Sequence, residues 1–190
     1  MFPACLVRIS AGAAYCSGTL LSPDTVLACA HFFRDVPNGA TVRTAGIIRT
    51  IIDVKTVPIS DIAVVRIRPF HHLEGARFPK VNVSFMPAPG TPTVTFGYGG
   101  HAERMQVRQG RWLAPLPLAL SRGRQTLVRP AGLVYNHPPA IKGDSGGPVI
   151  AGGEIIGIQS LIFDPWGVNL GIATVNLLPR IVAELVGAQR

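Results

Sequence analysis

The chain has 190 residues, a length typical of one domain or of two small lobes that share a core. Hydrophobic residues make up 47% and charged residues 15%, but no apolar run reaches the roughly 18 residues of a membrane-spanning helix. The 21 glycines and 17 prolines occur throughout the chain, which argues against a helix bundle and favours many short strands joined by tight turns. This amount of apolar material also excludes a disordered chain.

The net charge is +8, and 15 of the 18 basic residues are arginines. Such an excess allows attraction to an acidic partner. A nucleic-acid-binding protein would need a recognised motif or aromatic residues among these charges, and only Trp112 lies near the densest stretch. We therefore expect a solvated basic face and no nucleic-acid partner. The densest stretch contains Arg104, Arg108, Arg111, Arg122, Arg124 and Arg129.

Short runs rich in Val, Ile, Thr and Leu fill the first part of the chain, separated by turn residues such as Ser22-Pro23-Asp24. Residues 69–92 are rich in proline and lack periodicity, which is typical of a linker. The strands expected before this linker cover residues 5–10, 17–22, 25–33, 40–54 and 60–70.

A second set of strand-like runs follows the linker, and only the tail changes character. There Leu177, Ile181 and Leu185 recur at helical spacing, with Asn176 in the position of an N-cap. The expected strands of the second set cover residues 93–100, 105–112, 125–135, 147–153, 154–163 and 171–175. The chain thus divides into a first lobe at 1–84 (with the linker from about residue 69), a second lobe at 85–175 and a C-terminal helix at 176–190.

Three cysteines, Cys5, Cys16 and Cys29, lie within the first 30 residues. Their spacing is not that of a zinc site, and three thiols allow at most one disulfide within the chain. The pair His71-His72 near Glu74 lies in the linker, where we expect exposed side chains and no metal site.

The sharpest chemical signal is the loop Gly143-Asp144-Ser145-Gly146-Gly147-Pro148. A nucleophilic serine needs a tight turn that exposes its hydroxyl, with N–H groups converging where an oxyanion will form. Glycines beside the serine permit such a turn because they tolerate positive φ. The same string in isolation is equally compatible with a plain glycine-rich hairpin turn.

The order of residues along the chain separates the hydrolase families that share this string. α/β hydrolases place the histidine after the serine, and no histidine follows Ser145. The subtilisin order requires an acid before His31, where only Asp24 is available. The order His31, Asp61, Ser145 remains, with Asp53 as the competitor of Asp61.

Four segments match, in order, those of the chymotrypsin/trypsin-like serine proteases, and the chain resembles this family over nearly its whole length. Residues 16–21 are similar to the strand that leads to the catalytic histidine, 27–31 to the T-A-A-H signature and 61–64 to D-I-A-L. The loop GDSGGP matches completely. Weaker similarities are found at residues 96–99 and 157–160.

The resemblance implies an all-β fold of two six-stranded Greek-key β-barrels packed face to face, with a C-terminal helix and the active site between the barrels. In that fold His31 would take the proton of the Ser145 hydroxyl, and Asp61 would orient the imidazole and stabilise its charged form. The backbone N–H groups of Gly143 and Ser145 would form the oxyanion hole. No cofactor and no metal is expected.

One departure from the family pattern concerns the cysteines. Most members have a cysteine directly after the catalytic histidine that pairs with the one at the position of Cys16. Here Phe32 follows His31, and the nearest cysteine, Cys29, precedes the histidine. A Cys16–Cys29 bridge, a Cys5–Cys29 bridge and three free thiols all stay open, and we favour free thiols because small buried cysteines pack as hydrophobes.

A second departure concerns activation. Members activated from a zymogen pair a new N-terminal amine with the aspartate before the serine, here Asp144. Met1 lies only 15 residues before Cys16, too few to reach that carboxylate, so we expect activity without removal of an N-terminal segment. Because a buried carboxylate must be paired, we expect an internal cation instead. The candidates are Arg104, Arg108, Arg111, Arg122 and Arg124.

Matching the serine loop of this chain to that of the family also predicts the residues that bind the substrate. The position that is aspartate in Arg/Lys-cleaving relatives falls on Pro139, so a cationic P1 side chain (the residue before the scissile bond) would lack a counter-ion. Ile162 would narrow the pocket, Gly171 would leave space deeper in, and Lys142 could attract acidic substrate residues. We expect cleavage after small or medium uncharged residues. The predicted substrate-binding residues are Pro139, Ala140, Ile141, Lys142, Ser160, Leu161, Ile162 and Gly171.

The sequence therefore predicts a monomeric serine endopeptidase that hydrolyses protein or peptide substrates through an acyl-enzyme and has no membrane span. The alternative is a catalytically silent barrel that binds an acidic partner through its arginine-rich face. The resemblance slightly favours a secreted or extracytoplasmic protein, although no signal segment is apparent in this sequence.

Overall fold

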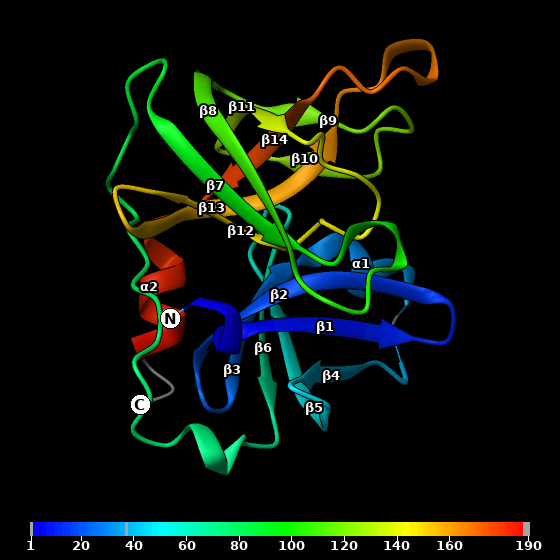
Figure 1. The fold of residues 1–190 in the computed structure, drawn as a ribbon, viewed down its shortest axis with the longest axis vertical. Helices are drawn as coiled ribbons and strands as arrows, with labels where there is room; N and C mark the ends of the chain where they lie inside the picture. The colour runs from blue at the N-terminus through cyan, green and yellow to red at the C-terminus, as the bar shows by residue number, and fades with distance from the viewer. Residues whose placement is uncertain (1, 37, 188–190) are drawn as a thin grey trace.

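Two closed antiparallel β-barrels, one above the other in Figure 1, make up most of the molecule. The computed structural model describes residues 2–36 and 38–187. The first barrel consists of β1 (Leu6–Ala11), β2 (Ala14–Ser22), β3 (Thr25–Cys29), β4 (Thr41–Thr44), β5 (Ile47–Thr56) and β6 (Ile62–Ile67). Its strands follow the order β1-β2-β3-β6-β5-β4 around the barrel, with every neighbouring pair antiparallel.

The second barrel also has six strands, in the order β11-β14-β13-β12-β7-β8. The prediction of an all-β fold with two six-stranded barrels is thus confirmed. The strands are β7 (Pro92–Gly97), β8 (Gln106–Leu116), β11 (Ala131–His137), β12 (Pro148–Ala151), β13 (Glu154–Ile162) and β14 (Ile172–Leu177). A separate two-stranded sheet pairs β9 (Ala119–Leu120) with β10 (Leu127–Val128).

The two barrels share part of their core. β3 is buried at all five positions, because it belongs to the first barrel and also contacts β13 of the second. Ile150, Ile155 and Ile158 of the second barrel belong to the same apolar cluster as the first-barrel side chains. A second cluster around Trp112 fills the interior of the second barrel. Burial of this kind stabilises by about 25 cal/mol per Å² of apolar surface and holds the two barrels in fixed positions.

Helices are short and few among the described residues. They are α1 (Ala30–Asp35), α2 (Arg180–Gly187) and the 3-10 turns η1 (Phe2–Cys5), η2 (His71–Leu73), η3 (Gly99–His101) and η4 (Pro165–Gly167). Figure 1 shows α2 (red) against the first barrel, and its Val182 is buried in the first-barrel core. None of the helices in the described part of the chain has the length and apolar character needed to cross a membrane.

Several expectations about the bounds of the elements were wrong. The runs 40–54 and 125–135 were each expected to be one strand, but the first forms β4 and β5 and the second forms β10 and the start of β11. The run 25–33 was expected to be one strand, but β3 ends at Cys29 and His31 lies on α1. The C-terminal helix was expected from Asn176, but Asn176 belongs to β14, where it pairs with Ile158. The helix begins after Pro179, which lacks an N–H and suits the start of a helix; residues 188–190 lie outside the described part.

Candidate active site

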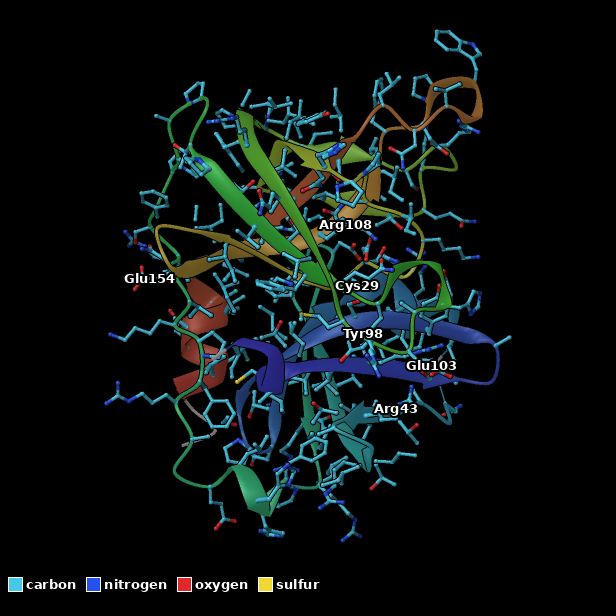
Figure 2. The ribbon with its side chains drawn as sticks, viewed as in Figure 1. Cys29, Arg43, Tyr98, Glu103, Arg108 and Glu154 are labelled. Carbon is cyan, nitrogen blue, oxygen red and sulfur yellow. The ribbon has the colours of Figure 1, made fainter. Side chains whose placement is uncertain are left out.

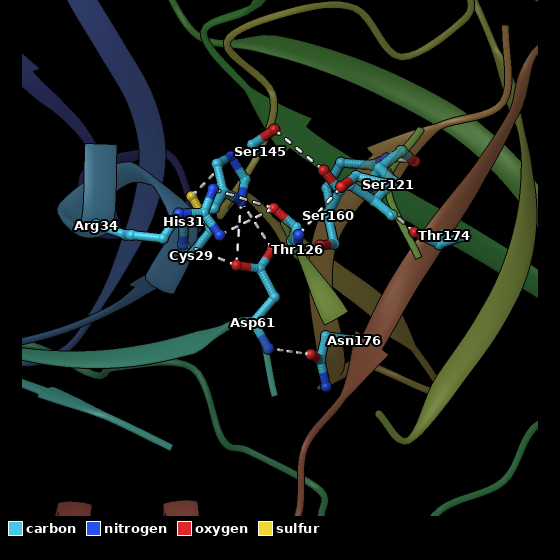
Figure 3. Close-up of polar contacts among 12 residues, drawn as sticks. Cys29, His31, Arg34, Asp61, Ser121, Thr126, Ser145, Ser160, Thr174 and Asn176 are labelled. Carbon is cyan, nitrogen blue, oxygen red and sulfur yellow. Dashed lines mark hydrogen bonds and ion pairs between the residues drawn. The ribbon is translucent and has the colours of Figure 1, made fainter. Parts of the chain in front are cut away.

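His31 and Asp61 lie next to the adjoining ends of two paired strands of the first barrel, β3 and β6. His31 lies two residues after the end of β3, Asp61 directly precedes β6, and Cys29 pairs with Ile62 in this ladder. The Nδ1 atom of His31 is 2.8 Å from Oδ2 and 3.1 Å from Oδ1 of Asp61, and the His31 backbone N–H donates to Oδ1 at 2.8 Å (Figure 3). The acceptor carboxylate places the proton on Nδ1, which leaves Nε2 free to accept a proton.

The Asp61 carboxylate is held by the second barrel as well as by His31. Its side chain is 1% exposed, and the Ser160 hydroxyl donates a short hydrogen bond to Oδ2. The Asn176 Oδ1 atom accepts the backbone N–H of Asp61 at 2.7 Å (Figure 3). It also accepts the Ser60 hydroxyl at 3.2 Å. The Asn176 amide in turn donates to the backbone carbonyls of Arg129, Pro130 and Leu177. Asn176 thus ties the loop that bears Asp61 to β14, a role that the sequence pattern did not reveal.

The serine loop lies between β11 and β12 and is anchored on β2 of the first barrel. The Ser17 N–H donates to the carbonyl of Ser145 at 2.8 Å, and the Ser17 hydroxyl donates to the carbonyl of Gly143 at 2.7 Å. A Cβ atom at Gly146 would lie 2.3 Å from the Ser17 carbonyl oxygen, and the φ angle of Gly146 is +81°. Glycine is required there because no other residue fits this close approach between the barrels.

The Ser145 hydroxyl and the His31 imidazole come from opposite sides of the barrel interface. In this structure the hydroxyl donates to the Ser160 carbonyl at 3.2 Å, and Nε2 of His31 lies 3.8 Å from Sγ of Cys29 (Figure 3). The described residues therefore show no direct Ser145–His31 hydrogen bond. Hydrogen bonds of this kind are often long without substrate and shorten in the reactive complex.

The backbone around Gly143 presents two N–H groups beside Ser145. The Lys142 carbonyl accepts the Gly100 N–H at 2.9 Å and the Tyr15 hydroxyl at 3.2 Å. Because the peptide is planar and trans, the Gly143 N–H points away from these partners. Neither the Gly143 nor the Ser145 N–H has a hydrogen-bond partner within the described ranges.

Asp144, next to the serine, is fully paired inside the second barrel. Nε of Arg108 lies 2.6 Å from its Oδ2, and both side chains are almost completely buried, at 4% and 1% exposure. The backbone N–H groups of Gly99 and Ile141 donate to the same carboxylate at 2.9 and 2.8 Å. Figure 2 shows Arg108 within the body of the second barrel. The expectation of an internal arginine is confirmed, and the residue is Arg108.

The surroundings of His31 raise the pKa of its imidazole above the ordinary 6.5. Burial opposes this increase, whereas the contacts of the ring with the Cys29 sulfur and the Asp61 carboxylate favour it. Burial and contact with Cys16 raise the pKa of the Cys29 thiol well above 9.0, so this thiol is neutral at pH 7 and contributes no charge there. The Asp61 carboxylate is therefore the group that stabilises the imidazolium at neutral pH.

Residues 16–158 match the family model described as a trypsin-like peptidase domain. The chain belongs to this family. The match covers all four of the segments quoted above and most of the second barrel, and it makes the protein a serine protease of the chymotrypsin-like fold that acts on protein or peptide substrates. A search of curated protein sequences finds no match.

Solved structures of proteases share the fold of this peptidase at low sequence identity. The Rv3671c protease of M. tuberculosis H37Rv, in an inactive Ser343Ala form, is 20% identical with a TM-score of 0.75, covering 100% of this chain and 89% of that one. Kallikrein-related peptidase 10 is 17% identical with a TM-score of 0.73, covering 99% and 96%. The MamO protease domain of Magnetospirillum magneticum is 21% identical with a TM-score of 0.68, covering 100% and 97%.

The three cysteines of the peptidase, Cys5, Cys16 and Cys29, are all free and buried. Free thiols were the favoured expectation, and the structure bears it out. What the sequence did not predict is the position of Cys29, whose sulfur lies against the ring nitrogen of His31 that faces away from Asp61.

The predicted substrate-binding segments lie on both sides of the serine loop. Ala140 is buried, and its carbonyl accepts the Asn169 side-chain N–H at 2.6 Å, so the loop after β13 is fastened to the segment before the serine. Pro139 and Ile141 line a pocket of about 650 Å³ together with Arg108. Lys142 is exposed.

The other predicted wall of the specificity pocket comes from the end of β13. Ser160 is buried, Leu161 and Ile162 are half-buried, and Ile162 pairs with Ala173 of β14. Gly171 was expected to leave open space, but a Cβ atom there would lie 2.9 Å from the Tyr135 ring. The missing side chain at Gly171 thus makes room for Tyr135.

A second pocket, of about 570 Å³, opens beside His31 and Asp61. Its walls combine the loop 57–60 of the first barrel with residues 125–127 of the second. Arg34, three residues after His31, connects the two walls of this pocket by donating hydrogen bonds to the Gln125 carbonyl and the Thr126 hydroxyl. The pocket therefore spans both barrels next to the histidine.

Proposed function

We propose that this protease is an endopeptidase in which Ser145, His31 and Asp61 form a catalytic triad. The observation that supports this most is the Asp61–His31 pair, which leaves Nε2 of the imidazole as an acceptor across the interface from the serine loop. The Ser145 Oγ atom attacks the carbonyl carbon of the scissile bond while its proton passes to Nε2 of His31. The N–H groups of Gly143 and Ser145 then stabilise the oxyanion, each contributing about 3–4 kcal/mol.

The rest of the cycle uses the same groups. His31 returns the proton to the leaving amine as the C–N bond breaks, which leaves an acyl group on Ser145. Water then attacks the acyl-enzyme while His31 accepts its proton, and Ser145 leaves with that proton. Throughout the cycle Asp61 orients the imidazole and is itself held in place by Ser160 and Asn176.

The P1 preference follows from the uncharged walls near the serine loop. We expect cleavage after Ala, Val, Thr and Leu, because Pro139, Ala140 and Ile141 offer a cationic side chain no counter-ion. A library of fluorogenic peptides that differ only at P1 measures this preference. Replacing Ile162 by Gly should increase kcat/KM for Phe and Tyr by about tenfold or more, whereas replacing exposed Val168 by Gly should not. Efficient cleavage after Arg or Lys by the unmodified protein would show that the assigned pocket is wrong.

The pH dependence of activity should report the titration of His31. Because only the neutral imidazole accepts the serine proton, and Asp61 raises the pKa of the imidazole, kcat/KM should rise with pH through a midpoint above 6.5. Replacing Asp61 by Asn should lower the midpoint and reduce kcat by about 10⁴-fold. Replacing Cys29 by Ala should lower the midpoint much less than Asp61→Asn does, since the neutral thiol supplies only its contact with Nε2 of His31. A profile flat between pH 5 and 9 would argue against His31 as the base.

A further inference from the structure

The connection between β13 and β14 presents unusually exposed apolar side chains. Trp166 is 95% exposed, and Phe163, Val168 and Leu170 on the same loop are each about half exposed. Burial of a large apolar side chain stabilises a protein relative to its exposure, so full exposure of an indole to water is unfavourable. Trp166 also has a positive φ of +54°, a backbone conformation that a bulky residue rarely adopts. Contiguous exposed apolar groups of this kind mark an interaction site.

The shape of this loop restricts its partner. Figure 1 shows it (orange) projecting from the second barrel at the upper right, away from the first barrel. A convex apolar tip can be buried without a matching pocket when it inserts between lipid headgroups. Tryptophan is the residue enriched at that boundary, since the ring is apolar and its N–H can stay hydrated.

Basic side chains border the same loop. Arg122 donates to the Asp164 carbonyl at 3.1 Å and lies 3.7 Å from the Asp164 carboxylate, so it neutralises the one acid in the segment 163–170. Arg122 belongs to the turn 121–124, which is closed by a hydrogen bond from the Arg124 N–H to the Ser121 carbonyl. Arg124 therefore lies two residues from Arg122, and its side chain is exposed. The net charge of the chain, +8, has the same sign. An exposed apolar tip beside unpaired basic charge is complementary to an anionic bilayer.

We propose that the loop 163–170 docks the protease on the surface of an anionic lipid bilayer, with Trp166 in the headgroup region and Arg124 against the lipid phosphates. Because Asn169 of this loop holds the Ala140 carbonyl beside the serine loop, docking would bring the substrate-binding side of the second barrel to the membrane surface. Stable docking requires both the insertion of the apolar loop and the attraction of Arg124 to the lipid phosphates, because one such contact alone gives only weak membrane binding.

The chain contains two tryptophans, and their environments make the test direct. Trp112 is fully buried and Trp166 is 95% exposed, so a shift in emission on adding vesicles reports Trp166. With vesicles of phosphatidylcholine and phosphatidylglycerol we expect a blue shift and co-sedimentation, both weakened by added salt. Vesicles of phosphatidylcholine alone should bind much less. A blue shift that appears on raising the protein concentration without lipid would instead identify a second copy of the chain as the partner and overturn the proposal.

Matched variants separate the two contacts. Trp166→Ala should weaken co-sedimentation by about tenfold or more, and Arg124→Gln by about fivefold. Arg180→Gln, which removes an exposed charge on α2 beside the first barrel, should change co-sedimentation little. All three variants should keep the peptidase activity on short peptides, because none of these residues belongs to the proposed triad or oxyanion hole. Absence of vesicle binding, equal binding to neutral vesicles, or equal effects of Arg124→Gln and Arg180→Gln would overturn the proposal.

Discussion

Replacing Ser145 by Ala should lower kcat by about 10⁶-fold, and adding His31→Ala to this variant should lower it hardly further. The two groups act as one unit, since the imidazole has no proton to accept once the hydroxyl is gone. The structure predicts little change in stability for Ser145→Ala, because the hydroxyl makes one hydrogen bond, to the Ser160 carbonyl. Steady-state kinetics on the best library peptide, together with thermal unfolding, measure both quantities. If the losses of the two single variants multiplied in the double variant, the residues would act independently and the proposed triad would be wrong.

Replacing Arg108 by Gln should reduce the free energy of unfolding by about 3–5 kcal/mol, because it leaves the buried Asp144 carboxylate without its counter-ion. Urea unfolding measures this loss. Arg104→Gln, which removes an exposed arginine from the same region, should change stability by about 0.5 kcal/mol or less. Activity should fall as well, since Asp144 also accepts the N–H groups that position the loop next to Ser145.

A second variant distinguishes the loss of the ion pair from a general packing defect. Adding Asp144→Asn to Arg108→Gln removes both charges and should restore part of the lost stability. No recovery in the double variant, or equal losses for Arg104→Gln and Arg108→Gln, would contradict the role given to this pair.

The fold was predictable because the strand-like runs along the chain and the order of the sequence motifs both indicated the same all-β architecture. Short β-branched runs with frequent turns predicted the strands. The motifs at His31, Asp61 and Ser145 carried the resemblance to the chymotrypsin-like proteases, and that resemblance implied the two barrels. Periodicity failed at two positions where tertiary contacts decide. His31 follows an apolar run that reads as a strand, yet the chain turns into α1 there. Asn176 resembles an N-cap, yet its side chain bonds to the loop of Asp61 from within β14.

The chemistry of the site was predictable in part. Because the aspartate before the serine is buried, the sequence predicts a cation beside it. Only the fold selects Arg108, because β8 places its guanidinium against Asp144 of the serine loop. The contact between Cys29 and His31 and the closing of the Gly171 space by Tyr135 depend on strand ends and loops that leave no pattern in the sequence. The residues that surround a sequence motif therefore become known only from the three-dimensional arrangement of the two barrels.

The most direct test of the proposed mechanism is the labelling of Ser145 by a fluorophosphonate, read by intact-mass spectrometry and peptide mapping. This reagent phosphonylates a serine only where a base removes its proton and an oxyanion site stabilises the product. We expect a single adduct on Ser145, formed faster as the pH rises through the titration of His31 and absent in Ser145→Ala. A natively folded protein that forms no adduct across this pH range would contradict the account and identify the chain as a catalytically silent barrel.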